Sequence, residues 1–599
     1  MLGHARQHQQ QGRLSEAESL YRQILNSTPD HSCALHALGL LAAQEGRGDD
    51  AVDLFRRAIA IDPNVAVYHL HLGLVLSRTA RSDDAIAALR CALKLDPDSY
   101  NAWVVLGLTM RDHGDIVGAT GAFRRAQEIQ PMSADAWTNL GNILQEQGEF
   151  AEGIQAHRQA LSLCPNHAAA ENNLGHALRR AQRFDEAIAA FRRALAMQPN
   201  FAEAHNNLGV ALLAKQELDE AIESFRRAIA ICPAFADAHN NYGCAVLEKN
   251  LDIEGAVAAH RKAVSLKPDF AEAHYNLGLA LLLKGDFREG WSEHEWRWLA
   301  PVLGLAHPRF RQPMWDGTPL GDRRILLHAE QGFGDTIHFA RYAARLAQNG
   351  GHVIVACMPE LKRLMQTLDA VDLVVDSHDV LPAFDVCCPL ASLPLLLGTT
   401  MQDIPAAVPY LHANPDDIAR WGRRLSTTSD RLKVGLVWAG GPRHARDRFR
   451  SIPLSALSPI LNIAGVCLIS LQKGQPPDPL RAAPLGEAIV DWTDELHDFA
   501  ETAALIENLD LVITVDTAVA HLAGALGRRV FLLLPFLPDW RWMLNRTDSP
   551  WYPTMRLFRQ PSAGDWAAPI QLVAEGLRGI LAQSGLDAEP ASDESPSTR

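Results

Sequence analysis

The sequence predicts a protein in two parts, an α-solenoid over residues 1–301 followed by a two-lobed α/β region. The solenoid is indicated by prolines and glycines that each recur every 34 residues, starting from Pro29 and Gly39. The α/β region is indicated by a change of pattern after Pro301, where this period stops and short apolar runs alternate with amphipathic ones.

Composition sets broad limits on function. The chain has 599 residues, of which 47% are hydrophobic and 21% charged, so several soluble domains are expected. A net charge of −14 argues against nucleic acid or an anionic membrane as the main partner. No window approaches the roughly 20 apolar residues of a membrane helix. Nine cysteines without Cys-x-x-Cys spacing favour reduced thiols and a cytoplasmic location.

The 34-residue unit predicts two antiparallel helices. Its glycine lies where two helices approach closely, and its proline ends the second helix. A single unit cannot bury its apolar face, so about nine units must stack. The period, with its Leu-Gly and Ala-x-x-x-Phe elements, resembles the tetratricopeptide repeat over residues 1–301. The last unit is rich in tryptophan, from Trp291 to Trp298, and is expected to cap the array against the next domain.

Five successive units carry asparagine two residues before the repeat glycine. These residues are Asn139, Asn173, Asn207, Asn241 and Asn276. An amide can bond both groups of a peptide backbone, so we predict that this row binds an acceptor polypeptide. A similar asparagine ladder is a feature of the protein O-GlcNAc transferases. The alternative is that these side chains bond between repeats or are helix residues without a binding role. His205, His239 and His274 share one phase and either flank the groove or are solvated.

The second half is expected to form two Rossmann-like lobes. Residues 302–322 are a connector, 323–413 the first lobe, 414–585 the second, and 586–599 a disordered tail. The predicted strands are 324–328, 353–356, 373–375 and 386–388 in the first lobe, and 434–438, 466–471, 511–515 and 530–534 in the second. The active cleft should lie between the lobes, at the carboxyl ends of these strands.

The first chemical motif follows the first predicted strand. Gly332-Phe333-Gly334-Asp335 forms a glycine turn before a helix, but Ile337 occupies the position where a dinucleotide fold needs a third glycine. Nicotinamide binding is therefore excluded, and Asp335 remains at the mouth of the cleft. Taken by itself, capping of the helix is the simpler role for Asp335.

The second motif follows the strand at 511–515. The residues Asp516, Thr517, Ala518 and His521 lead from a strand end into a helix, whose free N–H groups and dipole can bind an anion. Asp516 can accept hydrogen bonds from sugar hydroxyls. The structural alternatives are a helix cap for Asp516 and Thr517 and a packed histidine for His521.

Two regions supply positive charge at other strand ends. Arg443, Arg448 and Arg450 precede Ser451-Ile452-Pro453, and Lys473 follows the strand that ends at Leu471. Each alone could be a solvated surface residue. Together they suit a diphosphate.

These motifs resemble the bacterial heptosyltransferases, a GT-B glycosyltransferase family, and more closely the bacterial tetratricopeptide-repeat-fused glycosyltransferases. The resemblance implies a GT-B fold, Asp335 as catalytic base, and Gly334, Arg450, Asp516, Thr517, Ala518 and His521 at the nucleotide-sugar. This chain has Ala518 where the family has glycine and Arg450 where it commonly has lysine. The resemblance implies inverting transfer from a nucleotide-sugar co-substrate, with no cofactor and no metal, since the second half lacks an Asp-x-Asp pair.

The leading hypothesis is a glycosyltransferase that modifies a hydroxyl of an acceptor protein docked by the solenoid. Flagellin glycosyltransferases share this layout, so flagellin is the favoured acceptor. One alternative is a non-catalytic adaptor with a degenerate transferase module. Another is a glycosyltransferase that acts on lipopolysaccharide or another glycan.

Overall fold

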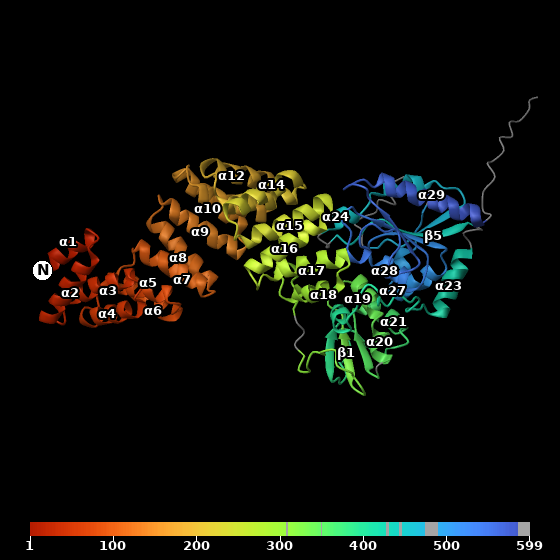
Figure 1. The fold of residues 1–599 in the computed structure, drawn as a ribbon, viewed down its shortest axis with the longest axis horizontal. Coiled ribbons are helices and arrows are strands. Elements are labelled where there is room, and N and C mark those ends of the chain that lie inside the picture. The colour runs from red at the N-terminus through yellow and green to blue at the C-terminus, as the bar shows by residue number, and fades with distance from the viewer. Residues whose placement is uncertain (307–309, 349, 427–430, 443–445, 474–488, 585–599) are drawn as a thin grey trace, which may run out of the picture. The chain divides into compact units, whose positions relative to one another are not determined.

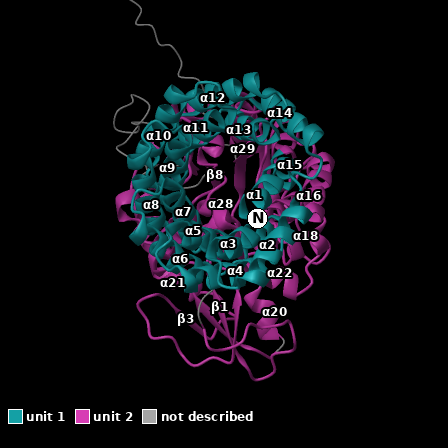
Figure 2. Cartoon of the chain, turned by 90° about the vertical axis from the view of Figure 1, so that its left-hand side faces the viewer, with its two compact units in different colours: residues 1–241 teal, residues 242–599 magenta. Residues whose placement is uncertain are grey.

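The computed structural model describes residues 1–306, 310–348, 350–426, 431–442, 446–473 and 489–584. The chain divides into two compact units, Met1–Asn241 and Tyr242–Arg599 (Figure 2). This division falls before the expected boundary at residue 301, because the last repeat helices make extensive contacts with the α/β region. The expected limits of the individual domains remain a prediction. The predicted tail at 586–599 and Arg443 lie outside the described residues.

Unit 1 is a run of antiparallel helix pairs (Figure 1). Its helices are α1 (Leu2–Gln10), α2 (Leu14–Ser27), α3 (Ser32–Gln44), α4 (Gly48–Ile61), α5 (Ala66–Arg78), α6 (Ser82–Leu95), α7 (Tyr100–Asp112), α8 (Ile116–Ile129), α9 (Ala134–Gln147), α10 (Phe150–Leu163), α11 (Ala168–Arg180), α12 (Phe184–Met197), α13 (Ala202–Ala214) and α14 (Leu218–Ile231). The two-helix repeat predicted from the 34-residue period is confirmed.

The repeat glycine is required by the helix crossing inside each unit. A Cβ atom on Gly175 of α11 would lie 2.6 Å from Cε1 of Phe191 on α12. A Cβ atom on Gly209 of α13 would lie at the same distance from Cε1 of Phe225 on α14. Both phenylalanines are completely buried. The 16-residue spacing between glycine and phenylalanine therefore encodes the close contact of the two helices.

The array continues into unit 2 and ends in the predicted tryptophan-rich cap. Its helices are α15 (Ala236–Asn250), which spans the unit boundary, α16 (Ile253–Leu266), α17 (Ala271–Lys284) and α18 (Phe287–His294), followed by the 3-10 helix η1 (Glu295–Trp298). Trp291 and Arg297 are buried, at 2% and 0% exposure. The cap is thus part of the core of unit 2 rather than a solvated end.

The first lobe holds a four-stranded parallel sheet in the order β3-β2-β1-β4. Its elements are β1 (Arg324–His328), α19 (Phe333–Ala340), α20 (Ala343–Gln348), β2 (His352–Ala356), α21 (Lys362–Met365), β3 (Leu373–Val375), β4 (Val386–Pro389) and α22 (Leu393–Leu396). The four strands confirm the prediction to within one residue. Within the connector, Trp315 lies against the edge strand β4, where its backbone N–H donates to the Cys387 carbonyl at 2.8 Å.

The second lobe holds a six-stranded parallel sheet in the order β10-β9-β8-β5-β6-β7. Its elements are α23 (Pro415–Leu425), β5 (Leu432–Val437), α24 (Asp447–Arg450), α25 (Ser458–Leu461), β6 (Val466–Ser470), β7 (Ile489–Val490), α27 (Phe499–Glu507), β8 (Leu511–Val515), α28 (Ala518–Ala525), β9 (Val530–Leu534), η9 (Trp540–Trp542), β10 (Met555–Arg559) and α29 (Ala567–Ser584). The sequence prediction missed β7 and β10. β7 has only two residues, and β10 is a short edge strand whose sequence, Met-Arg-Leu-Phe-Arg, contains two charged residues.

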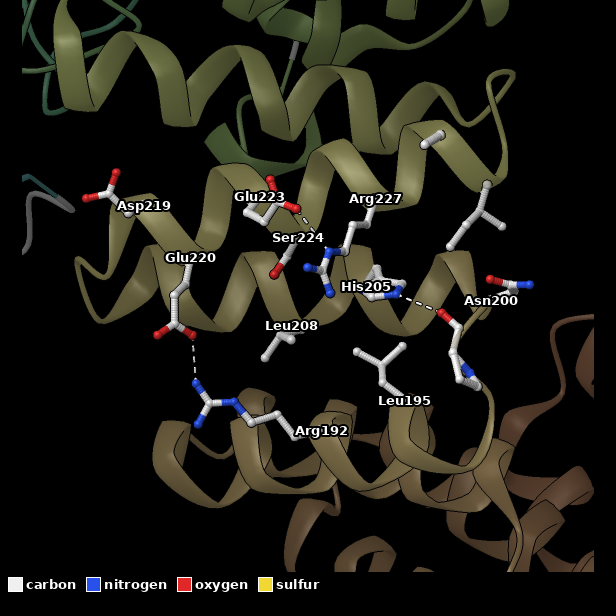
Figure 3. Close-up of a pocket in the computed structure, with 13 residues that line it drawn as sticks. Arg192, Leu195, Asn200, His205, Leu208, Asp219, Glu220, Glu223, Ser224 and Arg227 are labelled. Atoms are coloured by element: carbon white, nitrogen blue, oxygen red, sulfur yellow. Dashed lines mark hydrogen bonds and ion pairs between the residues drawn. The ribbon is translucent and has the colours of Figure 1, made fainter.

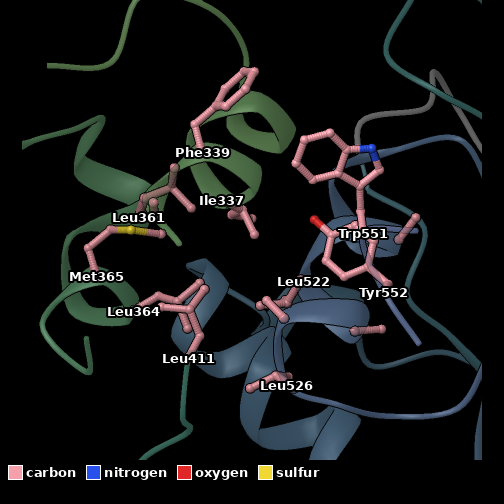
Figure 4. Packing of buried hydrophobic residues seen from close by; sticks show 14 of the residues in the cluster. Ile337, Phe339, Leu361, Leu364, Met365, Leu411, Leu522, Leu526, Trp551 and Tyr552 are labelled. Atoms are coloured by element: carbon pink, nitrogen blue, oxygen red, sulfur yellow. The ribbon is translucent and has the colours of Figure 1, made fainter. Parts of the chain in front are cut away.

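One hydrophobic core runs through the cap and both lobes. Trp291 of the cap, Ile337 and Phe339 of α19, and Trp551 belong to the same buried cluster. Figure 4 shows Ile337 of α19 on the side facing Leu522 of α28. Because both helices that carry the predicted motifs pack in this core, their N-termini are held firmly with respect to each other.

Candidate active site

Asp335 lies in the first turn of α19, directly beyond the carboxyl end of β1. Its Oδ2 accepts the Gly332 N–H at 3.1 Å, so it caps the helix, as the simpler sequence interpretation predicts. Its Oδ1 accepts Nη2 of Arg541 at 2.5 Å. The side chain remains 29% exposed. Capping therefore leaves part of the carboxylate open to a ligand.

The two predicted motifs meet at the start of α28. A Cβ atom on Gly334 would lie 2.9 Å from Cδ2 of His521 and 3.5 Å from Cα of Ala518. The N-terminal ends of α19 and α28 therefore abut, with glycine at the point of closest approach. Asp516 and Thr517 precede α28 and are partly exposed. Two helix N-termini that lie next to each other favour a bound anion.

Asp516 lies in a crowded electrostatic environment at the end of β8. Loss of solvent contact and then the nearby Asp539 carboxylate raise its pKa to about 6, while Arg450 and Arg541 oppose the shift. The carboxyl of Asp516 therefore takes up a proton at a higher pH than an ordinary aspartate does. The Thr517 hydroxyl lies 3.2 Å from Oγ1 of Thr514 at the same strand end.

Arg450 joins this site, whereas Lys473 has a different partner. Nη1 of Arg450 donates to the Asp516 carbonyl at 2.8 Å, and its Nε donates to Asp447 at 3.2 Å. Lys473 donates to the Leu496 carbonyl. Among the described contacts, none joins Lys473 to Arg450 or Asp516. The structure thus brings one of these two predicted bases to the strand ends that carry the acidic motif.

His521 is a packed histidine. Its Nδ1 is hydrogen-bonded to the Tyr552 hydroxyl at 2.9 Å, and the same hydroxyl lies 3.2 Å from Nδ1 of His338. Burial, together with nearby arginines, lowers the pKa of His521 well below its ordinary value, so the ring is neutral. Tyr552 therefore connects α19 and α28 through their histidines. Nucleotide binding by His521 stays a prediction.

Arg541 is a residue of this site that sequence reasoning did not assign. It lies in η9, after β9, and its side chain is only 7% exposed. Besides Asp335, it donates to Asp539 at 2.9 Å, and its guanidinium covers the Trp540 ring at 4.3 Å from the centroid. The Asp-Trp-Arg-Trp run at 539–542 was visible in the sequence, but nothing local connected it to Asp335.

The last repeat reaches the same site. Helix α17 contacts η9, and the Tyr275 ring on α17 lies 5.7 Å from the His294 ring. Burial, with contributions from the Asp539 and Asp335 charges, raises the pKa of Tyr275 to about 12. The Tyr275 side chain remains partly exposed. The final repeat is thus close enough to contribute to the surroundings of Asp335.

A buried ion pair connects the cap to the loop after β1. Arg297 donates to Oε1 of Glu330 at 2.8 Å, to Glu295 at 2.5 Å and to the Ser392 hydroxyl at 2.7 Å. The Glu330 side chain is 4% exposed. Burial raises the pKa of Glu330 to about 7, against the lowering effect of Arg297.

The asparagine row makes bonds between repeats, which was one alternative in the sequence interpretation. Nδ2 of Asn173 donates to Asn142 at 3.0 Å, that of Asn207 to Asn172 at 3.1 Å and that of Asn241 to Asn206 at 2.9 Å, while Asn276 donates to Cys244 at 3.5 Å. All five, Asn139 included, keep part of their surface exposed. Peptide binding by the row remains a prediction.

The companion histidines have a structural role. Nε2 of His205, His239 and His274 is hydrogen-bonded to a proline carbonyl six residues earlier, at 3.0, 3.1 and 3.0 Å. His205 also lines a cavity of about 680 Å³ in unit 1, between α12, α13 and α14. Figure 3 shows charged side chains around it, including the ion pair of Arg192 with Glu220 at 2.7 Å.

The described part of the chain holds neither a candidate metal site nor a candidate membrane span. No group of three or more His, Cys, Asp or Glu side chains there could hold a metal ion. No helix there is both long and apolar enough to cross a membrane.

Three family profiles match the chain. The C-terminal domain of cilia and flagella-associated protein 70 matches residues 34–244, and the TPR repeat matches residues 252–285. Glycosyltransferase family 9 (heptosyltransferase) matches residues 496–533, a segment that includes Asp516 and His521. The fold and these matches define a protein with tetratricopeptide repeats and a C-terminal α/β region of two parallel sheets, one segment of which matches glycosyltransferase family 9.

Individual proteins are similar to parts of this chain. Protein FlbA of Caulobacter vibrioides is 28% identical over 324 residues, which cover 50% of this chain and 53% of FlbA. The match thus spans about half the length of that relative. The repeat protein YrrB is 24% identical, with a TM-score of 0.27 over 31% of this chain and 95% of YrrB. MamA is 26% identical, with a TM-score of 0.28 over 29% of this chain and 96% of MamA. The chain thus joins tetratricopeptide repeats to a segment of the glycosyltransferase family 9 type and is related to FlbA.

Proposed function

We propose that this chain is a glycosyltransferase that moves a sugar from a nucleotide-activated donor to a hydroxyl of an acceptor protein docked by the repeats. The observation that carries this proposal is the meeting of Gly334-Asp335 with Asp516-Thr517-Ala518 at two abutting helix N-termini. The glycosyltransferase family 9 match covers the second of these motifs. The favoured acceptor is flagellin, and the favoured location is the cytoplasm.

The proposed reaction is a single displacement with inversion. The acceptor oxygen bonds to the anomeric carbon as the bond from that carbon to the diphosphate breaks, and the acceptor proton passes to Asp335. The helix N-termini and Arg450 stabilise the charge on the leaving diphosphate, so the proposal includes neither metal nor cofactor. Lys473 donates one hydrogen bond to the Leu496 carbonyl, and its ammonium group has two further N–H donors for a phosphate.

Donor binding is tested first. UDP-, GDP-, ADP- and CMP-linked sugars are screened by thermal shift with the full chain, and we expect one nucleotide class to raise the unfolding temperature. Stabilisation follows the ratio of ligand concentration to Kd. No shift with any of the four would overturn the proposal and favour the adaptor alternative.

Transfer is tested with a matched pair of variants. Asp335→Asn keeps an oxygen that can accept the Gly332 N–H but removes the base, so transfer to flagellin should fall by at least about 100-fold. The control is Asp372→Asn, because Asp372 accepts the Val353 N–H at 2.7 Å at the opposite end of the sheet. Equal activity in the two variants would exclude Asp335 as the base.

Acceptor docking is tested by two neighbouring asparagines. Asn207→Ala and Asn206→Ala each remove one inter-repeat hydrogen bond, but only Asn207 keeps part of its surface exposed. We expect Asn207→Ala to weaken flagellin capture by the full chain more than Asn206→Ala does. Equal capture would remove the asparagine row from the proposal.

A further inference from the structure

Arg541 connects the two lobes of the α/β region through charge. It lies in η9 of the second lobe, and its Nη2 reaches Asp335 of the first lobe at 2.5 Å. Its Nη1 donates to Asp539 at 2.9 Å. The backbone N–H of Arg541 donates to the same Asp539 oxygen at 3.0 Å, which fixes that carboxylate as well. One guanidinium thus bridges two carboxylates from different lobes.

Two aromatic rings lie close to the guanidinium of Arg541. The Trp540 centroid lies 4.3 Å from its central carbon and the Phe339 centroid lies 5.3 Å away. Trp540 in turn packs edge-on against Trp291 of the cap, with centroids 5.0 Å apart. A planar guanidinium stacked in this way has little freedom to reorient. The repeat cap therefore contributes to the position of Arg541.

The contacts of the Asp335 carboxylate fix its orientation but do not use all of its hydrogen-bond acceptor sites. Oδ1 accepts from Arg541 and Oδ2 accepts from the Gly332 backbone, so both oxygens are fixed. A carboxylate can accept about four hydrogen bonds, and the side chain is 29% exposed. Lone pairs of an oriented carboxylate therefore remain for a ligand hydroxyl.

We infer that Arg541 is a positioning residue of the transfer site: it fixes the Asp335 carboxylate at the start of α19 and is itself fixed by Asp539 and Trp540. This inference rests on the proposed glycosyltransferase function. Removing Arg541 releases Oδ1 of Asp335, so the carboxylate can turn about the Gly332 contact that remains, and a misplacement of about 1 Å can reduce a rate 100-fold.

The first experiment measures transfer kinetics. Arg541→Met should lower kcat about 100-fold and change the donor KM less than threefold. Arg541→Lys should have an intermediate kcat, because an ammonium group keeps the charge but lacks the planar, two-pronged donor geometry of the guanidinium. Added guanidinium should restore part of the rate in Arg541→Ala. The control is Arg546→Met on the same segment, since Arg546 pairs with exposed Asp548 at 2.6 Å. An unchanged kcat in Arg541→Met would overturn the inference.

The second experiment needs no donor. A double-mutant cycle of Arg541→Met and Asp335→Asn is followed by thermal unfolding of the full chain, and the two shifts should be non-additive because the side chains contact each other. Additive shifts would overturn the inference, whether or not transfer is observed. If no donor supports transfer by the wild-type chain, the proposed function fails, and this cycle still decides whether Arg541 fixes Asp335.

Discussion

Arg297→Met tests how strongly the repeat cap is tied to the α/β region. Arg297 is completely buried and bonds to Glu330, Glu295 and Ser392. Methionine fills much of its volume but leaves Glu330 without its cation. Breaking a buried ion pair from one side costs about 3–5 kcal/mol, because the remaining charge is left in a poorly solvated place.

The cost should depend on pH. Glu330 has a pKa of about 7 in the folded chain, above the ordinary value of 4.5, so the folded state binds its proton more tightly than the unfolded state does. That contribution is fully present below pH 4.5 and is lost as the pH rises through about 7. Without Arg297 the folded pKa rises further, so the stability difference from wild type should be nearly constant below about pH 7 and should widen as the pH rises above that value. The slope is at most about 1.4 kcal/mol per pH unit for one proton.

The assay is urea unfolding followed by tryptophan fluorescence at pH 5 and pH 8. The control is Arg261→Met, which breaks the exposed Arg261–Glu289 pair and should cost less than about 1 kcal/mol. Arg297→Met combined with Glu330→Gln should lose the pH dependence. A cost for Arg297→Met that equals the control, or that is the same at both pH values, would refute the reasoning.

Three further predictions address the repeats and the site. Gly209→Ala places a methyl 2.6 Å from Phe225 Cε1, so an overpacking cost of about 1–3 kcal/mol should exceed the helix-propensity gain of about 1 kcal/mol and destabilise the chain. Gly121→Ala meets open space and should stabilise the chain. Equal urea midpoints for the two variants would contradict this prediction. Tyr552→Phe removes the hydroxyl bonded by two buried histidines and should cost about 1–3 kcal/mol, and an unchanged thermal midpoint would argue against it. Binding of a nucleotide-sugar should tighten as the pH falls through about 6, because protonation of Asp516 removes a negative charge beside the anion while the diphosphate diester itself takes up no proton in this range. In titration calorimetry Asp516→Asn should lose this dependence, and its persistence would exclude Asp516 as the cause.

Much of the fold could be predicted because its signals are local. The repeat glycine contacts a phenylalanine 16 residues later, so one 34-residue unit contains the contact that shapes it. The eight predicted strands are short apolar runs, and each is present within two residues of its predicted ends. The strand at Met555–Arg559 was missed because it carries two arginines, so it does not form a continuous apolar run.

The candidate site was predicted only in part. Asp335, Asp516 and Thr517 were visible because each follows a strand and begins a helix. The inter-repeat bonds of the asparagine row were one of the open interpretations, and only the positions of neighbouring helices show that they form.

By itself, the sequence determined the repeat array, the change to parallel sheets, and the two strand ends that carry the acidic motifs, since each depends on residues close together in the chain. Only the tertiary structure decided that Arg541 pairs with Asp335 across 206 positions and that Arg297 of the cap pairs with Glu330. Those pairings depend on how a cap and two lobes share one core, and both lie outside the repeat pattern, so no periodicity along the chain encodes them.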